Sequence, residues 1–283
     1  MIKKAAVIND ISGFGKCSLT AAIPILSVMG VQPCPMPTAV LTNQSGYDNH
    51  YCVDMTDELM HYKEMWTKNG EHFDGIYSGY IPNKKQVAII ADFIKTFRKS
   101  DTVVLVDPVM GDAGKMYKAY DSETCIKVCT LANTADIITP NLTEFCIMTG
   151  TDYTTLTSMS ENDDIFSFIE QKAAPLLNME GKCVIVTGIQ RPDGIYNCLI
   201  KRNGIYPSKT VRYGESFSGT GDIFASIICA SVINGTEISK AVDMAAKFIE
   251  ESIMDTVKEK YNRNDGINFE KFLYKLHSEE VCL

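Results

Sequence analysis

The stretch Thr102-Val103-Val104-Leu105-Val106-Asp107 places four consecutive aliphatic residues directly before an acidic one. An apolar run without polar alternation is typical of a strand that is covered on both faces of a parallel sheet. Asp107 follows the last apolar residue, and ligands of open α/β sheets bind outside the carboxyl ends of the strands. The stretch therefore predicts a buried parallel strand with a candidate ligand-binding carboxylate at its end.

The same alternation of apolar runs and amphipathic runs continues in both directions along the chain. The predicted strands are residues 5–8, 75–78, 102–106, 136–138 and 183–186. The predicted helices are residues 17–29, 55–66, 84–97, 122–131, 141–148, 165–177, 222–233, 238–253 and 269–276. An Asn-Gly step in Arg202-Asn203-Gly204, between the strand-like runs 195–200 and 205–211, predicts a β-hairpin. The pattern predicts an α/β fold, a mostly parallel sheet with helices on both faces. Because no repeat or linker interrupts it, we expect residues 1–283 to form a single domain.

The composition narrows the range of partners. Among 283 residues, 45% are hydrophobic and 22% are charged, which supplies a core and excludes a disordered chain. The formal net charge is −8 and no run of basic residues occurs, so neither nucleic acid nor a membrane surface is expected as a partner. Residues 17–47 carry no charged side chain, but prolines interrupt them. We interpret them as buried chain at a core, a pocket or a subunit contact rather than as a membrane helix.

The cysteines and histidines point to no metal centre. The ten cysteines form no CxxC pair, and most stand in apolar segments, as free thiols do in a reducing compartment. With no secretory signal visible, we expect a cytoplasmic protein. Cys125 and Cys129 lie one helical turn apart, and two neighbouring thiols are favoured over a redox pair or half a metal site. The four histidines show no metal-binding spacing.

The clearest candidate site is Phe217-Ser218-Gly219-Thr220-Gly221-Asp222 at the start of a predicted helix. Small residues let backbone N–H groups approach an anion there, and the helix dipole favours a phosphate. A carboxylate beside an anion site needs a purpose, and Asp222 is suited to accept a proton from a hydroxyl that attacks phosphorus. The alternative is a first-turn acidic residue that only stabilises the helix.

Two further segments follow predicted strands. Asp107-Pro108-Val109-Met110-Gly111-Asp112 places a carboxylate where Mg²⁺ is often held through waters, although Asp-Pro is also a common turn starter. Thr139-Pro140-Asn141-Leu142-Thr143-Glu144 has Asn followed three residues later by Glu, which is close to a capping box. On this segment alone, helix capping is favoured over ligand binding, although the two are compatible.

Two nucleotide-binding motifs are excluded at the N-terminus. Gly13 and Gly15 follow a strand, but Ser18 replaces the third glycine of a Rossmann motif and no acidic residue follows at the required spacing. Gly15-Lys16 is followed by Cys17 rather than by Ser or Thr, so it is not a P-loop.

Taken together, these segments resemble the ribokinase superfamily of ATP-dependent kinases and, within it, the pyridoxal kinases. The resemblance covers nearly the whole chain. The segments that carry it are residues 9–15 (NDISGFG), 42–47 (TNQSGY), 78–80 (SGY), 107–112 (DPVMGD), 138–144 (ITPNLTE) and 219–222 (GTGD). The resemblance implies a ribokinase-like fold, a homodimer, and ATP and a B6 vitamer as partners.

It also implies roles for residues on both sides of the reaction. Asp222 corresponds to the catalytic base for the 5′-hydroxyl of the vitamer, and Gly219, Thr220 and Gly221 to the anion hole. The nucleotide side comprises Asp107, Thr139, Asn141, Glu144 and Thr187, with Asp107 and Glu144 holding Mg²⁺ largely through water. The vitamer side comprises Ser12, against the pyridine ring, and Ser45, Gly46 and Tyr80.

The resemblance implies phosphorylation of pyridoxal, and also of pyridoxamine or pyridoxine, at the 5′-hydroxyl. A dependence on K⁺ is left open. Relatives that phosphorylate hydroxymethylpyrimidine, and some pyridoxal kinases like them, often have Cys where Asp222 stands, so the Asp found here favours a pyridoxal kinase proper. A hydroxymethylpyrimidine kinase and a non-catalytic vitamin or nucleotide sensor remain the alternatives. Lys115-Met116-Tyr117 is the candidate flap over the active site, with an ordinary surface loop as the alternative.

Overall fold

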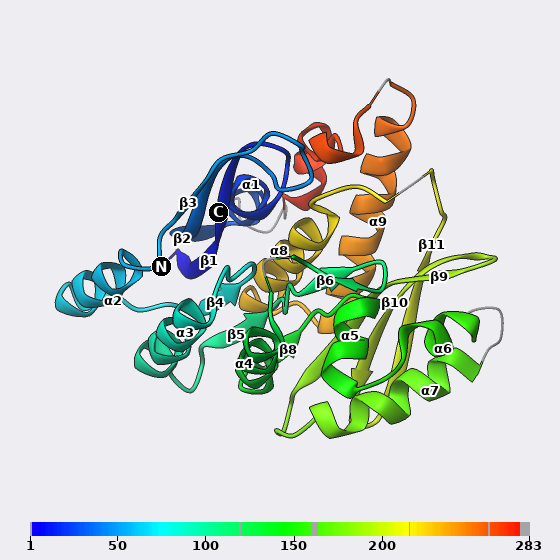
Figure 1. Ribbon diagram of the computed structural model, residues 1–283, viewed down its shortest axis with the longest axis horizontal. Coiled ribbons are helices and arrows are strands. Elements are labelled where there is room, and N and C mark those ends of the chain that lie inside the picture. The colour runs from blue at the N-terminus through cyan, green and yellow to red at the C-terminus, as the bar shows by residue number, and fades with distance from the viewer. Residues whose placement is uncertain (1, 119, 160–163, 215, 260, 278–283) are drawn as a thin grey trace.

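A central sheet organises the computed structural model, which describes residues 2–118, 120–159, 164–214, 216–259 and 261–277 (Figure 1). Within these residues the sheet has nine strands. In spatial order they are β11 (Gly204–Thr210), β10 (Gly194–Lys201), β9 (Cys183–Arg191), β8 (Ile137–Ile138), β5 (Val103–Val106), β4 (Gly75–Ser78), β1 (Lys3–Phe14), β2 (Val31–Asn43) and β3 (Cys52–Asp54). The strands from β9 to β2 pair in parallel, and β3, β10 and β11 add antiparallel edges. The predicted mostly parallel α/β sheet is confirmed.

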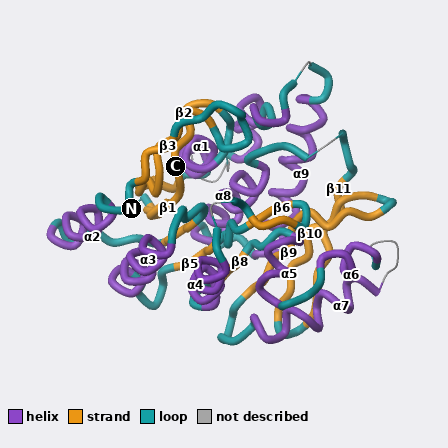
Figure 2. The backbone as a smooth tube through the Cα atoms, viewed as in Figure 1, coloured by secondary structure: helices purple, strands orange, loops and turns teal. Residues whose placement is uncertain are grey.

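Helices cover both faces of the sheet, and Figure 2 shows its strands between them. One apolar cluster joins the sheet to α1 (Ser18–Val28), α8 (Thr220–Ile233), α9 (Ile238–Thr256) and the 3₁₀ segment η3 (Phe269–Leu276). The other joins it to α2 (Leu59–Lys68), α3 (Lys84–Phe97), α4 (Ser122–Asn133), α5 (Leu142–Thr149), α6 (Tyr153–Ser158), α7 (Asp164–Ala173) and η1 (Ala174–Leu176).

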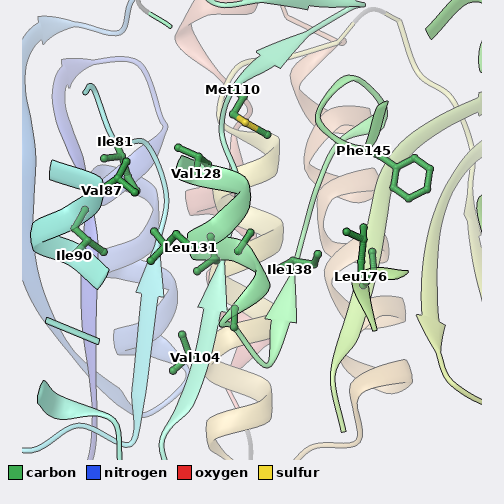
Figure 3. Close-up of a cluster of buried hydrophobic side chains, with 14 of the residues drawn as sticks. Ile81, Val87, Ile90, Val104, Met110, Val128, Leu131, Ile138, Phe145 and Leu176 are labelled. Carbon is green, nitrogen blue, oxygen red and sulfur yellow. The ribbon is translucent and has the colours of Figure 1, made fainter. Parts of the chain in front are cut away.

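The burial of strand β5 on both faces explains why its sequence does not alternate between apolar and polar residues. Val104 and Val106 pack into the cluster of α3 and α4, which Figure 3 shows from within, whereas Leu105 packs into the cluster of α1 and α8. Because successive side chains point to opposite faces and both faces are covered, every position must be apolar.

Strand β2 was not predicted, because its prolines were interpreted as interruptions. Pro33, Pro35 and Pro37 stand at alternate positions, so the residues between them keep their N–H groups for pairing with β1. On the other edge, β3 pairs with β2 only at residues 39–41, beyond the last proline. The uncharged segment 17–47 is thus α1, β2 and the turn after it, and it is buried only in part: Ile25 and Met36 are fully buried, whereas Val40 and Ser45 are exposed.

The predicted hairpin is present as β10 and β11, but its turn is Arg202-Asn203. Lys201 pairs with Gly204, which begins β11 with a φ of +135°.

Helix α2 begins at Leu59 rather than at Met55, after a turn. None of the described helices combines the length and apolar character needed to cross a membrane.

Parallel pairing brings the carboxyl ends of β1, β4, β5, β8 and β9 to one edge of the sheet. Strand β1 runs past this edge and changes register between Asn9 and Ile11, which is a β-bulge. Bulges redirect side chains and are common beside active sites. The N-terminus of α8 lies at the same edge, because Asn9 contacts its first turn.

Candidate active site

Helix α8 begins in a conformation that requires glycine. Gly219 precedes the first helical residue, Thr220, with a φ of +82°. A Cβ atom on Gly219 would lie 2.0 Å from the carbonyl oxygen of Lys16, so the helix start packs directly on the loop after β1. The N–H groups of the first turn have no partner within the helix and lie at the positive end of its dipole. An anion is therefore favoured beside Thr220, Gly221 and Asp222.

Asp222 is half-buried in this first turn, with its carboxylate held from β1 and α1. The Asn9 side chain donates from Nδ2 to Asp222 Oδ1 at 2.9 Å, and the backbone N–H of Ser18 donates to the same carboxylate. Burial raises the pKa of Asp222 to about 6, against the effect of these two hydrogen bonds, which lower it. The group is therefore ionised at neutral pH, with a pKa close to the value that suits a general base.

Asn9 belongs to the site, although its sequence pattern did not indicate a role for it. It is fully buried. Its Oδ1 accepts hydrogen bonds from the backbone N–H groups of Tyr80, at 2.8 Å, and Asp10, at 3.0 Å. Gly79 makes room for it, because a Cβ atom there would lie 2.3 Å from Asn9 Nδ2. The Asn9 amide therefore fixes the end of β4 relative to Asp222.

Asp10 is a second carboxylate of the site for which the sequence pattern did not indicate a role. It is buried, and it accepts hydrogen bonds from Ser18 Oγ at 2.6 Å and Ser12 Oγ at 3.1 Å. Burial raises the pKa of Asp10, whereas the two hydroxyl groups lower it. Ser18 adopts a φ of +50°, which is rare for a residue with a side chain and here lets it bind both Asp10 and Asp222. The Ser12 hydroxyl is thus directed at Asp10.

Asp107 lies at the end of β5, close to Asp222. A Cβ atom on Gly221 would lie 3.9 Å from Asp107 Oδ2, and Thr139 Oγ1 donates to Asp107 Oδ1 at 3.1 Å. Burial, followed by the negative charge of Asp222, raises the pKa of Asp107 above its ordinary value. Two carboxylates that repel each other in a buried place are stabilised by a nearby cation.

Glu144 forms the complete capping box at the N-terminus of α5. Asn141 Oδ1 accepts from the N–H groups of Thr143 and Glu144, and Glu144 Oε2 accepts from the N–H of Asn141 at 2.8 Å. Glu144 Oε1 accepts from the N–H of Met110 at 3.1 Å. Burial and the charge of Asp107 raise the pKa of Glu144 well above its ordinary value. The predicted capping is confirmed, and both carboxylate oxygens are already hydrogen-bonded.

The candidate flap lies on a small hairpin tied to this capping box. Strands β6 (Gly111–Asp112) and β7 (Lys115–Met116) pair around the turn Ala113-Gly114, where both residues have positive φ. Asn141 Nδ2 donates to the carbonyl oxygen of Gly111 at 2.8 Å. Thr143 Oγ1 accepts from the N–H of Gly114 at 2.8 Å. The hairpin is therefore anchored at its base on α5.

The other predicted nucleotide residue, Thr187, lies beside Asn141 within β9. The two residues form a parallel bridge, and the N–H of Thr187 donates to the carbonyl oxygen of Pro140 at 2.9 Å. The structure thus brings the predicted nucleotide side together where β5 and β8 end, with Thr187 inside β9 beside Asn141.

The predicted vitamer-side residues lie on three different segments. Ser12 is in β1, Tyr80 follows β4, and Ser45 and Gly46 lie in the loop after β2. Tyr80 is joined to Asp222 through Asn9, as described above. Ser45 is exposed, and within the described residues its side chain forms no hydrogen bond with Asp222.

Within the described residues, no three His, Cys, Asp or Glu side chains are arranged to hold a metal ion directly. Two surface hollows, of about 370 and 290 Å³, lie elsewhere, beside α7 and at the N-termini of α3 and α4. The first hollow has no carboxylate in its lining, and the helix starts at the second hollow are capped by Asn83 and Asp121. The carboxylates that could serve a reaction converge instead at the edge of the sheet.

Comparisons with known proteins identify the family of the chain. The phosphomethylpyrimidine kinase family profile matches residues 19–266. A Bacteroides thetaiotaomicron protein described as a phosphomethylpyrimidine kinase and crystallised with pyridoxal is 34% identical, with a TM-score of 0.91 over 98% of this chain and 96% of that chain. Pyridoxal kinase from Lactobacillus plantarum is 25% identical, with a TM-score of 0.87 over 98% and 97% of the two chains.

A curated Schizosaccharomyces pombe relative, named as pyridoxal kinase C18.10, is 26% identical over 204 residues, which span 69% of this chain and 57% of the relative. The family match covers most of the chain, and the structural likeness covers nearly all of it. The predicted resemblance to pyridoxal kinases is confirmed, and the chain belongs to the phosphomethylpyrimidine kinase family.

Proposed function

We propose that this chain is a pyridoxal kinase (EC 2.7.1.35), which transfers the γ-phosphoryl group of ATP to the 5′-hydroxyl of pyridoxal and also of pyridoxamine and pyridoxine. One observation carries the proposal: a half-buried carboxylate, Asp222, stands in the first turn of α8 beside free N–H groups. A base next to an anion site is what transfer of a phosphoryl group to a hydroxyl requires. The whole chain, residues 1–283, acts as one kinase domain.

On the acceptor side, Asp222 takes the proton of the 5′-hydroxyl while the new O–P bond forms and the bond to the leaving ADP oxygen breaks. The hydrogen bond from Asn9 Nδ2 fixes the orientation of the Asp222 carboxylate. The N–H groups at Gly219, Thr220 and Gly221 stabilise the negative charge of the transferring group. Because these donors are backbone groups at a helix start, they need no reorganisation during the reaction.

On the nucleotide side, Asp107, Thr139, Asn141, Glu144 and Thr187 contact ATP and its metal. Asp107 Oδ2 has no hydrogen-bond donor among the described residues, and the mutual repulsion of the buried carboxylates fits a nearby divalent cation. Both oxygens of Glu144 already accept backbone N–H groups. Asp107 and Glu144 would therefore hold Mg²⁺ largely through water, as is usual for Mg²⁺ with phosphates. When bound, Mg²⁺ neutralises phosphate charge.

On the vitamer side, Ser12, Ser45, Gly46 and Tyr80 line the pocket for the pyridine ring. The positions of Ser12 and Tyr80 support this assignment. Ser12 donates a hydrogen bond to Asp10, which lies beside Asp222, and the N–H of Tyr80 donates to Asn9, which contacts Asp222. The B. thetaiotaomicron relative with pyridoxal supports the substrate class.

The test is a coupled assay of ADP release and product formation with Mg²⁺·ATP. Pyridoxal, pyridoxamine, pyridoxine and hydroxymethylpyrimidine are compared in parallel. We expect a higher kcat/KM on the pyridines than on the pyrimidine. Turnover of the pyrimidine alone would contradict the proposal and favour the alternative that the family description raises. Ligand binding without any turnover would favour a vitamin or nucleotide sensor.

We also propose that the protein is a cytoplasmic homodimer. The nine described cysteines are free thiols, as in proteins of reducing compartments. Val40 and Val53 are paired across β2 and β3 and are 41% and 44% exposed, and Tyr51 beside them is 69% exposed. Such an apolar surface is typical of a contact between subunits. Light scattering tests the oligomeric state. We expect the wild-type protein to be a dimer and Val40→Asp to be a monomer, and a monomeric wild-type protein would contradict the proposed dimer.

A further inference from the structure

A short turn near the C-terminus meets two loops of the active site. It comprises η2 (Arg263–Asp265) and Gly266, and we refer to it as the 263–266 turn. The N–H of Lys16, in the loop after β1, donates to the carbonyl oxygen of Asp265 at 3.1 Å. The N–H of Ser218, in the loop before α8, donates to the carbonyl oxygen of Arg263 at 3.1 Å. The turn therefore joins the two loops that meet at Gly219.

The same turn holds the loop after β2, which carries Ser45 and Gly46. Asn264 Nδ2 donates to the carbonyl oxygen of Gly46 at 2.8 Å. Gln44 Nε2 lies 3.3 Å from both the carbonyl oxygen of Asn264 and Ser218 Oγ. The hydroxyl group of Tyr47 donates to the carboxylate of Asp265. Three loops that are distant in sequence thus converge on one turn.

The packing at this junction leaves little room for adjustment. Gly266 has a φ of +82°, and a Cβ atom there would lie 2.9 Å from Lys16 Cβ. A Cβ atom on Gly46 would lie 2.8 Å from Asn264 Oδ1 and 2.8 Å from Gln44 Nε2. Because the Asn264 and Gln44 side chains pack so closely against the backbone at Gly46, we expect a change at Asn264 to be transmitted to the position of the 44–47 loop rather than absorbed.

We propose that Asn264 is a positioning residue for the vitamer pocket. Its side-chain amide holds the carbonyl oxygen of Gly46 and thereby sets the distance between the 44–47 loop and the start of α8. The inference rests on the proposed function, because it takes this loop as one wall of the vitamer pocket. The described residues of the nucleotide side, on β5, β8 and β9, form no hydrogen bond with Asn264, so we expect the nucleotide side to be unaffected.

The experiment compares Asn264→Ala with wild type and with Asn178→Ala as a matched control. Asn178 is an exposed asparagine whose Nδ2 likewise donates to a backbone carbonyl, that of Asn133, at 3.3 Å, away from the site. KM and kcat are measured for pyridoxal and for ATP, and hydrogen exchange is measured at the amides of residues 44–47. Thermal unfolding shows that each variant is folded.

We expect Asn264→Ala to raise the KM for pyridoxal about tenfold, since misplacement of a pocket wall weakens substrate positioning. The KM for ATP stays within about twofold, and exchange at residues 44–47 becomes faster. Asn178→Ala changes none of these quantities. If Asn264→Ala does not fold, Tyr47→Phe, which removes only the contact with Asp265, is expected to shift the KM for pyridoxal in the same direction by a smaller factor.

The outcomes separate the inference from the proposed function. A folded Asn264→Ala enzyme whose KM for pyridoxal matches that of wild type overturns the positioning role, whereas the kinase assignment stands. An equal rise in the KM for pyridoxal and for ATP also overturns it, because that is the result of a general structural defect. A wild-type protein without turnover on any B6 vitamer overturns the proposed function itself, and with it the vitamer pocket.

Discussion

The two carboxylate-bearing regions of the site differ in how completely the protein satisfies their charges. Glu144 accepts backbone N–H groups on both oxygens and completes a capping box. Asp222 accepts hydrogen bonds from Asn9 and Ser18, but it stays half-buried at the start of α8. The difference shows that position at a strand or helix end does not define a role. The exposure of a carboxylate, together with whether both of its oxygens are hydrogen-bonded, determines whether it mainly stabilises the fold or remains available for a proton.

The strongest way to break this comparison is the substitution Asp222→Asn. We expect kcat to fall by about 10²- to 10⁴-fold, because the base is removed while the shape is retained. ATP affinity and the melting temperature should not fall, since a carboxylate whose pKa is raised by burial costs folding free energy when it is ionised. Asp243→Asn is the matched control, because Asp243 also accepts side-chain hydrogen bonds on a helix, at 3.1 Å from Tyr206 and 2.5 Å from Ser208. Unchanged turnover in Asp222→Asn would refute the assignment of the base.

The pH dependence sharpens the same comparison. Burial raises the pKa of Asp222 to about 6, and the base must be ionised to accept a proton. The value of kcat/KM should therefore be maximal above about pH 7 and fall about tenfold per pH unit below about pH 6. Asn9→Ala removes a hydrogen bond that lowers this pKa, so it should shift the acidic limb to higher pH. An acidic limb that does not move in Asn9→Ala would show that another group controls it.

Substitutions at Glu144 are expected to distinguish its contribution to stability from its contribution to nucleotide binding. Glu144→Ala leaves two backbone N–H groups without acceptors and should lower the free energy of unfolding by about 2 kcal/mol. Glu144→Gln keeps an acceptor but removes the charge, so it should retain more of that stability and raise the KM for Mg²⁺·ATP severalfold. Urea unfolding and initial rates measure both effects. Asp152→Ala, which removes the cap of α6, should cost about 1 kcal/mol without changing the KM. An effect of Glu144→Gln on stability alone would assign Glu144 to capping only.

The smallest effect is expected from two serines around Asp10. Ser12 and Ser18 each donate one hydroxyl hydrogen bond to this carboxylate. If Ser12 acts only through Asp10, Ser12→Ala and Ser18→Ala should raise the KM for pyridoxal by similar factors of about two- to fivefold. A larger effect of Ser12→Ala on pyridoxal alone would show a direct contact of Ser12 with the pyridine ring, as the resemblance implies. Initial rates with pyridoxal and ATP varied separately distinguish the two cases.

Much of the architecture was predictable because it depends on local patterns. The four aliphatic residues of β5 require cover on both faces, and the structure supplies α3 and α4 on one face and α1 and α8 on the other. The capping box of Asn141 and Glu144 spans four residues, so its geometry follows from adjacent sequence. Strand β2 was missed because the prolines were considered one by one, whereas their alternate spacing preserves the N–H groups that face β1.

The sequence by itself determined most of the strands and helices, the helix start at Gly219 to Asp222, and the polar residues that follow the strands. Only the tertiary structure decided how these residues act on one another. The hydrogen bond from Asn9 to Asp222 joins positions 213 residues apart, and that from Asn264 to Gly46 joins positions 218 apart. Propensity and spacing report on neighbours along the chain, whereas the pKa of a carboxylate and the position of a loop depend on groups that only folding brings together.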